Sequence, residues 1–146
     1  MTAIHIALGV AVIAVNGVAG LYGAWAWWLE RPAPGFWPLL RTGQALVMIE
    51  VIDGAILLLT GKDLPPLHLI YGLLPIGVSF FAEQLRLTAA ETVLANHGLE
   101  GRADVERLPR EEQHELVRVI VRREIGVMAA SAVVVALLGV RAAGGL

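Results

Sequence analysis

Four long apolar runs, separated by short polar or helix-breaking segments, make up most of this 146-residue chain. The first three runs reach the roughly 20 residues that a helix needs to cross the hydrocarbon core of a bilayer, and the fourth does so if it extends back through 111–121. The connections at 30–35 and 61–66 are short and rich in glycine and proline, so we expect neighbouring helices to be antiparallel. The pattern predicts one domain, 1–146, folded as an all-α, integral membrane, antiparallel four-helix bundle. The expected helices are at about 4–29, 38–60, 66–97 and 109–141, and the last two extend into the cytoplasm.

Composition supports a membrane protein and removes several classes of function. The mean hydropathy is +0.70 and only 16% of the residues are charged, compared with about 25% in soluble domains. Cysteine is absent, which excludes disulfides, thiolate metal sites and covalent attachment of haem. A formal net charge of -2 gives no reason to expect a nucleic-acid partner, so the lipid bilayer is the expected environment.

The cations predict the orientation. Only Lys62 and Arg141 lie on one side of the predicted bundle. The positive-inside rule therefore predicts a multi-pass protein of the plasma membrane with both termini extracytoplasmic. The cations expected on the cytoplasmic side are Arg31, Arg41, Arg86, Arg102, Arg107, Arg110, Arg118, Arg122 and Arg123.

Two histidines begin membrane helices at the same side of the bundle, and each is followed one turn deeper by glycine. His5 precedes Gly9, and His68 precedes Gly72, on helix faces that otherwise carry small and polar residues. Such faces pack inside membrane bundles, so we expect both imidazoles to point inward at matching depth. We interpret His5 and His68 as metal ligands to the iron of one haem b, with the two glycines leaving room for the porphyrin. The alternative is that each histidine is hydrogen-bonded at the membrane interface.

Four further residues are candidates near this site. Tyr71 would touch a haem face or simply fill the core, and Lys62 is the lysine nearest the expected propionates. Glu50 and Asp53 share one face of the second helix, where a carboxylate is costly unless it faces the protein interior. They are candidates for proton transfer, quinone binding or orientation of a ligand histidine, or else fix the register of the helices by hydrogen bonds. Counting residues from the helix end places Asp53 deeper than the histidines and below the haem.

The pattern around these residues resembles heme A synthase over about the first 85 residues. The similar segments are GQALVMIEVIDG at 43–54, LLLTG at 57–61 and LHL at 67–69. The resemblance implies haem ligation by His68 and by His5, near the outer face. Family members have eight helices in two halves, so this chain is similar to one half, and a homodimer would imitate the pair. Ile6 follows His5 where the family usually has arginine, and the cysteine pair of some members is absent, so the resemblance implies haem binding rather than methyl hydroxylation.

Three functions follow as hypotheses. The first is a membrane b-type cytochrome that binds one haem by two histidines and exchanges electrons with quinone or a redox protein. The second is a cofactor-free accessory or assembly subunit of a larger membrane complex, and the third is a proton-coupled transport component that uses Glu50 and Asp53. No metalloprotease, phosphate-loop, nucleophile-elbow or di-iron motif is present, so we expect no catalytic residues. If the chain is an enzyme, it is an oxidoreductase.

Overall fold

The chain folds into helices throughout, as the apolar pattern predicts. The computed structural model describes residues 3–63 and 65–144, and the described residues form no strand. The four long helices differ from the predicted bounds by one or two residues, and the all-α fold is confirmed. The helices are α1 (Ala3–Trp28), α2 (Phe36–Leu59), α3 (Pro66–Asn96), α4 (Arg102–Arg107) and α5 (Arg110–Ala142).

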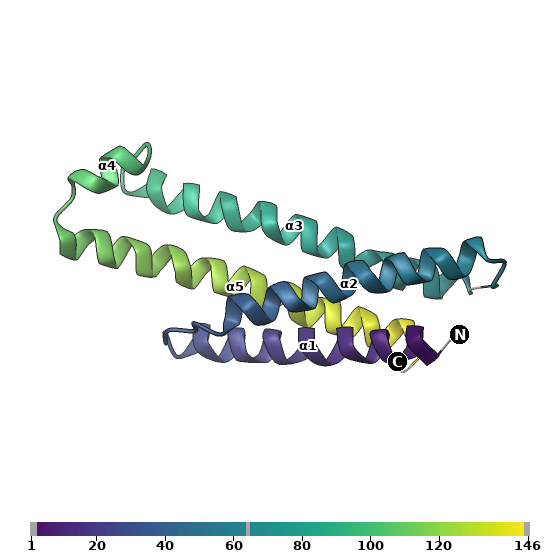
Figure 1. Cartoon of the computed structure of the whole chain (residues 1–146). Coiled ribbons are helices and arrows are strands. Elements are labelled where there is room, and N and C mark those ends of the chain that lie inside the picture. The colour runs from purple at the N-terminus through teal and green to yellow at the C-terminus, as the bar shows by residue number, and fades with distance from the viewer. Residues whose placement is uncertain (1–2, 64, 145–146) are drawn as a thin grey trace.

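The long helices run back and forth along one axis, which gives the molecule two distinct ends (Figure 1). Both ends of the described chain lie near the α2–α3 turn, at what we call the terminal end. The α1–α2 turn and α4 lie toward the opposite, hairpin end, where α4 and the start of α5 extend well beyond α1.

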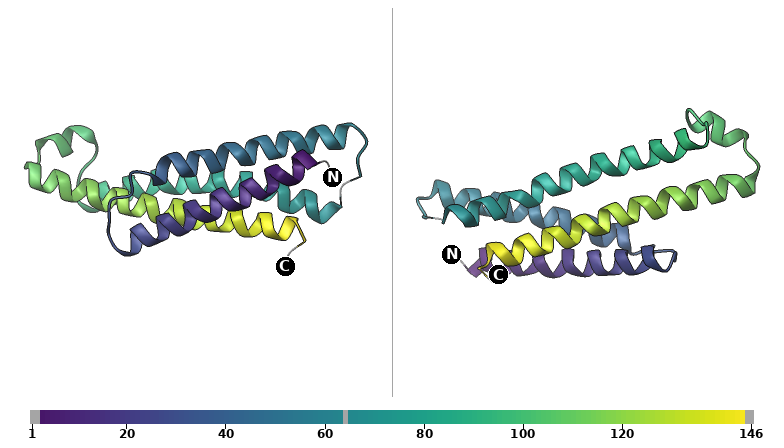
Figure 2. Two further views of the ribbon diagram at one scale, coloured as in Figure 1. Left: turned by 60° about the horizontal axis from the view of Figure 1, so that its bottom comes forward. Right: turned by 180° about the vertical axis from the view of Figure 1, so that it is seen from behind.

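Helix α5 is the centre of the packing. It packs along both α1 and α3, while α2 packs mainly against α1 and makes little contact with α3 or α5. The right-hand view in Figure 2 shows α5 between α1 and α3. Because α2 and α3 are joined by a short turn yet touch so little, the bundle is less tightly packed between them.

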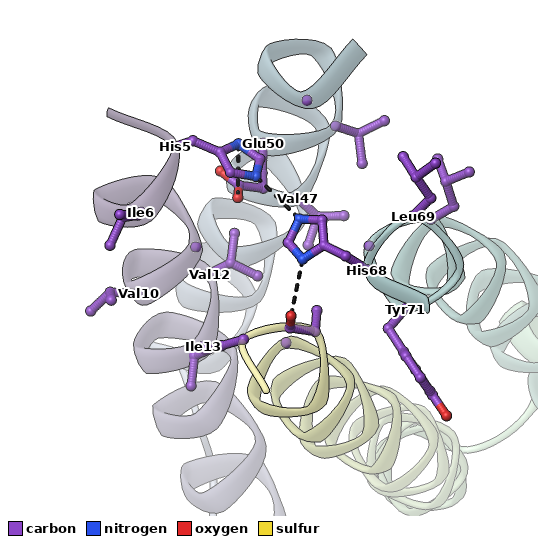
Figure 3. Close-up of a pocket in the computed structure, with 18 of the residues that line it drawn as sticks. His5, Ile6, Val10, Val12, Ile13, Val47, Glu50, His68, Leu69 and Tyr71 are labelled. Carbon is purple, nitrogen blue, oxygen red and sulfur yellow. Dashed lines mark hydrogen bonds and ion pairs between the residues drawn. The ribbon is translucent and has the colours of Figure 1, made fainter. Parts of the chain in front are cut away.

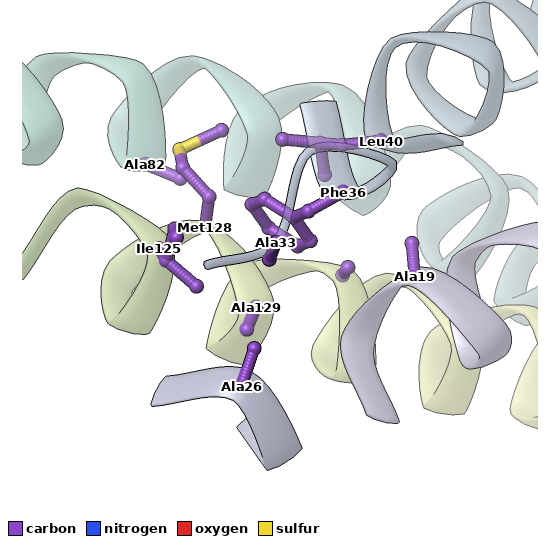
Figure 4. Close-up of a cluster of buried hydrophobic side chains, with 10 residues drawn as sticks. Ala19, Ala26, Ala33, Phe36, Leu40, Ala82, Ile125, Met128 and Ala129 are labelled. Carbon is purple, nitrogen blue, oxygen red and sulfur yellow. The ribbon is translucent and has the colours of Figure 1, made fainter. Parts of the chain in front are cut away.

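Small residues allow α1 and α5 to approach closely. Ala19 and Ala26 of α1 are almost completely buried beside Ala129 of α5, in the cluster shown in Figure 4. Phe36, at the start of α2, and Met128 are both 0% exposed and fill the rest of this cluster. Close backbone approach over small residues is the usual way in which membrane helices associate, since lipid gives no hydrophobic drive.

The outward faces of the long helices are apolar. All four are long and apolar enough to cross a membrane, judged by length and composition. Large side chains such as Leu21, Leu59 and Phe81 are 71%, 87% and 67% exposed. Exposed apolar area of this extent is normal in contact with lipid and rare in water. The chain is therefore a multi-pass membrane protein.

Glycines form the sharp ends of α2 and α3. Gly61 (φ 80°) follows α2 and Gly98 (φ 68°) follows α3, both in the left-handed region that glycine adopts without strain. The next residue in each case donates its N–H to a carbonyl of the last turn, Lys62 to Leu57 at 3.1 Å and Leu99 to Leu94 at 3.0 Å. This is the usual glycine C-cap, and at Gly61 it lets α3 return beside α2.

Candidate cofactor site

His5 and His68 meet at the terminal end, inside the bundle (Figure 3). His5 lies in the first turn of α1 and is only 5% exposed, and His68 lies in the first turn of α3. Their Nε2 atoms are 3.4 Å apart, and the ring centroids are 5.7 Å apart with planes inclined by 58°. Two residues that are 63 positions apart in the chain thus point the same nitrogen at each other.

The other nitrogen of each ring is held by an oxygen. His5 Nδ1 lies 3.0 Å from Asp53 Oδ2 and 3.4 Å from Glu50 Oε1, and His68 Nδ1 lies 3.0 Å from the carbonyl oxygen of Ala142. A carbonyl can only accept, so His68 donates from Nδ1, and in the neutral ring its Nε2 lone pair faces His5. Histidines that bind metals are oriented in this way, by a carboxylate or a backbone carbonyl on the far nitrogen.

A cavity of about 580 Å³ adjoins the two rings and is walled by α1, α2, α3 and α5. This volume is within the range of small-molecule and cofactor sites. Most of the lining is aliphatic, from Val10, Ile13, Val47, Val51, Leu58 and Leu69 among others. A Cβ at Gly72 would meet nothing within 4 Å, whereas one at Gly9 would lie 3.3 Å from Glu50 Oε1. Of the two predicted glycines, Gly72 therefore borders open space and Gly9 makes room for Glu50.

Glu50 brings an unsatisfied oxygen to the site. Its Oε1 faces His5, while Oε2 is buried and has no hydrogen-bond partner, alone among side-chain atoms in the described part of the chain. Leaving a buried oxygen unpaired costs about 1–3 kcal/mol, so the carboxyl group favours a donor supplied by a proton or a ligand.

Asp53 is placed differently from the prediction. We expected it below the histidines, but its carboxylate contacts His5 directly and therefore lies at the same level. The reason is that the helix ends are not flush, because the last turns of α2 project beyond the start of α1 (Figure 1). Of the roles considered for Asp53, orientation of a histidine is the one that this contact supports.

Of the two remaining predicted residues, Tyr71 and Lys62, only the first lines the cavity. Tyr71 lines the cavity, and the guanidinium of Arg141 lies 5.5 Å from its ring centre. Lys62 lies in the nearby α2–α3 turn and is not among the described residues that line the cavity. The contribution of Gly139 and Ala142 of α5, and of Ala143 just after it, was missed. The run of small residues at the end of that helix is the sequence signal that indicates close backbone approach.

A second polar cluster lies farther toward the hairpin end. Glu83 of α3 accepts hydrogen bonds from Arg41 and Gln44 of α2 and from Arg86 one turn along α3. Arg86 also lies 3.8 Å from Glu124 of α5. Glu83 thus forms ion pairs with both Arg41 and Arg86. Its charges are balanced within the bundle, which indicates a structural role.

Neither a metal-binding cluster nor a known relative identifies the ligand of this site. Among the described residues, no group of three or more histidine, cysteine or acidic side chains is placed to hold a metal ion. Comparison with family models, curated proteins and solved structures found no match. The resemblance to heme A synthase thus stays a prediction that depends on the residues quoted for it.

Proposed function

We propose that the cavity at the terminal end binds one haem b, whose iron His5 and His68 would hold. The protein would be a membrane cytochrome that exchanges electrons with quinone or with a redox protein. The observation that carries the proposal is the facing pair of Nε2 atoms, 3.4 Å apart, with both Nδ1 atoms held by oxygens. A haem needs only two ligands from the protein, so the lack of a larger ligand cluster is compatible with it.

The residues fit the group in three respects. Imidazole nitrogens lie about 2.0–2.1 Å from a bound metal, so two that share one iron are at most about 4 Å apart, and the Nε2 atoms, 3.4 Å apart, would have to separate slightly to hold it. The cavity volume and its aliphatic walls suit a flat apolar cofactor. The open space beside Gly72 lies one turn from a ligand, where a side chain would otherwise obstruct the porphyrin.

Haem supplies one-electron transfer, and the protein residues tune and enclose it. Asp53 makes the His5 imidazole a stronger donor than an unsupported ring, while the Ala142 carbonyl orients His68 more weakly. The distribution of cations supports placing this site near the extracytoplasmic face of the plasma membrane, with both termini on that side. A partner would then reach it from the outer aqueous phase, or as a quinone from the bilayer.

Filling the open space beside Gly72 tests whether the cavity holds the cofactor. We expect Gly72→Leu to weaken haem binding by about tenfold or more, because its side chain extends into the cavity. Gly77→Leu is the matched control, since a Cβ there also meets nothing within 4 Å and Gly77 does not line the cavity. Haem titration of each purified variant, followed by absorption, measures the difference. Equal affinities for the two variants would contradict this location.

Replacing Asp53 with asparagine tests its role toward His5. The neutral amide is a weaker acceptor, so the oxidised iron loses more stabilisation than the reduced iron and the midpoint potential should rise. A tenfold difference between the two oxidation states corresponds to roughly 60 mV. Asp63→Asn, on the exposed α2–α3 turn, changes the charge equally without touching the histidines. If a redox titration shows the same shift in midpoint potential for both variants, the specific role of Asp53 is contradicted.

A proton-coupled transport component is the second candidate, because Asp53, Glu50, His5 and His68 form one connected polar group. Proton flux in protein-containing liposomes that is lost in Asp53→Asn, from a protein that stays colourless after haem supplementation, would favour it. A protein that stays colourless after haem supplementation and shows no proton flux would instead favour the cofactor-free accessory subunit.

A further inference from the structure

A second cavity, of about 570 Å³, lies nearer the hairpin end, between α1, α3 and α5. Apart from one arginine and one tryptophan, its lining is small and aliphatic. The residues that matter here are Ala24, Trp27, Arg123, Gly126, Ala130 and Val133. None of them belongs to the cavity beside the histidines.

Arg123 is the cationic side chain at this cavity, and its charge is not balanced by the bundle. It is exposed and forms no hydrogen bond or ion pair with any described residue. Neighbouring arginines differ: Arg122 pairs with Glu30 at 2.9 Å and Arg118 pairs with Glu115 at 2.9 Å. An unpaired guanidinium beside an apolar wall is suited to an anionic group that comes from outside the chain.

The cavity extends along α5 from its charged part into its uncharged, apolar part. Residues 125–140 carry no charge, so Arg123 lies just outside the expected hydrocarbon layer. Gly126, Ala130 and Val133 follow it on one face of the helix, and Val133 is about 15 Å along the axis at 1.5 Å per residue. Trp27, at the end of α1, lies at the level where tryptophan side chains concentrate in membrane proteins.

We propose that this cavity binds one anionic phospholipid. Its phosphate would pair with Arg123, and an acyl chain would follow the Gly126–Ala130–Val133 face toward the centre of the bilayer. Inorganic phosphate would use the arginine but not the apolar wall, and an apolar ligand would use the wall but not the charge. A lipid with net negative charge uses both, and basic pockets between membrane helices bind such lipids. The inference depends on insertion in a membrane and is independent of haem binding.

Native mass spectrometry of the full chain in detergent, with phosphatidylglycerol and phosphatidylcholine of identical acyl chains, tests this site. We expect one phosphatidylglycerol to be retained in preference to phosphatidylcholine. Arg123→Gln should weaken phosphatidylglycerol binding about fivefold and remove the preference. Arg118→Gln, which removes the same charge from an exposed and already paired position, should leave binding unchanged. Ala130→Phe, which narrows the apolar wall, should weaken the binding of both lipids.

Three results would overturn the proposal. One is equal binding of the two lipids by the unmodified protein. Another is the same loss in Arg118→Gln as in Arg123→Gln, which would indicate general surface charge. The third is full displacement of the lipid by millimolar inorganic phosphate, which would indicate an anion site without a lipid. Helix content measured by circular dichroism confirms that the variants fold. Ala130→Phe tests the apolar wall of the cavity separately, because it changes no charge.

Discussion

Replacing His68 with alanine should abolish the haem spectrum of the purified protein. With both histidines present, we expect sharp α and β bands on reduction, as two imidazole ligands give. The alanine variant removes one of the two proposed ligands and leaves the His5 imidazole facing an empty position. Because loss of even a supporting residue costs 10–100-fold in metal affinity, loss of a ligand should cost more than about a hundredfold. His5→Ala should have the same effect.

His97→Ala and His114→Ala are the matched controls, since both residues lie in the α3–α5 hairpin far along the chain from the cavity. Both should keep the full spectrum and the full haem content per chain. Circular dichroism and gel filtration of all four variants separate loss of haem from loss of folding. A folded His68→Ala protein with an unchanged spectrum would refute ligation by this residue, and with it the proposed cytochrome.

The helices were predictable because a bilayer leaves the backbone few choices. Apolar runs of spanning length must be helical, since every N–H and C=O group in hydrocarbon has to be paired within the segment. Proline and glycine at 30–35 and 61–66 then locate the turns closely. Packing was less predictable. The sequence gives no direct sign that α2 would contact α1 far more than α3, because that preference depends on which small residues meet across helices.

The site was predictable as far as side-chain faces define it. The stripe that begins with His5 and the stripe that begins with His68 both face inward, and the structure brings the two rings together. The depth of Asp53 was wrong because the count assumed that the helix ends are level, which nothing in a sequence specifies. The hydrogen bond from His68 to the Ala142 carbonyl could not be predicted for another reason. Every residue has a backbone oxygen, so the residue type does not indicate which one accepts a hydrogen bond.

The two polar clusters divide the space between α2 and α3. Arg41 and Gln44 of α2 hydrogen-bond Glu83 of α3, which ties together two helices that otherwise make little contact. At the terminal end Asp53 and Glu50 of α2 instead approach His5 of α1, and α3 contributes His68 and the open space beside Gly72. The cluster around Glu83 therefore holds α2 and α3 together toward the hairpin end. The cavity lies at the terminal end, where these two helices are less tightly joined.

Replacing Gly20 with alanine should destabilise the bundle, because at this glycine the backbones of α1 and α5 approach closely. A Cβ there would lie 2.8 Å from the backbone nitrogen of Val133 and 3.2 Å from the carbonyl oxygen of Ala129. Backbone atoms of a packed helix cannot move aside without moving the helix. We expect the free energy of unfolding to fall by about 2–3 kcal/mol, even though alanine alone favours a helix by about 1 kcal/mol over glycine.

Gly17→Ala, one turn away on the same helix, provides a control of opposite sign. Its Cβ would lie 3.9 Å from the Cβ of Ala136, an ordinary van der Waals contact. Alanine there should stabilise the protein by up to about 1 kcal/mol through helix propensity and a less flexible unfolded chain. Reversible unfolding in mixed micelles, followed by circular dichroism, measures both changes. If the two variants shift stability in the same direction, α1 and α5 do not pack in the register that brings Gly20 against Val133. The cavity proposed to bind lipid would then lack the Val133 part of its wall.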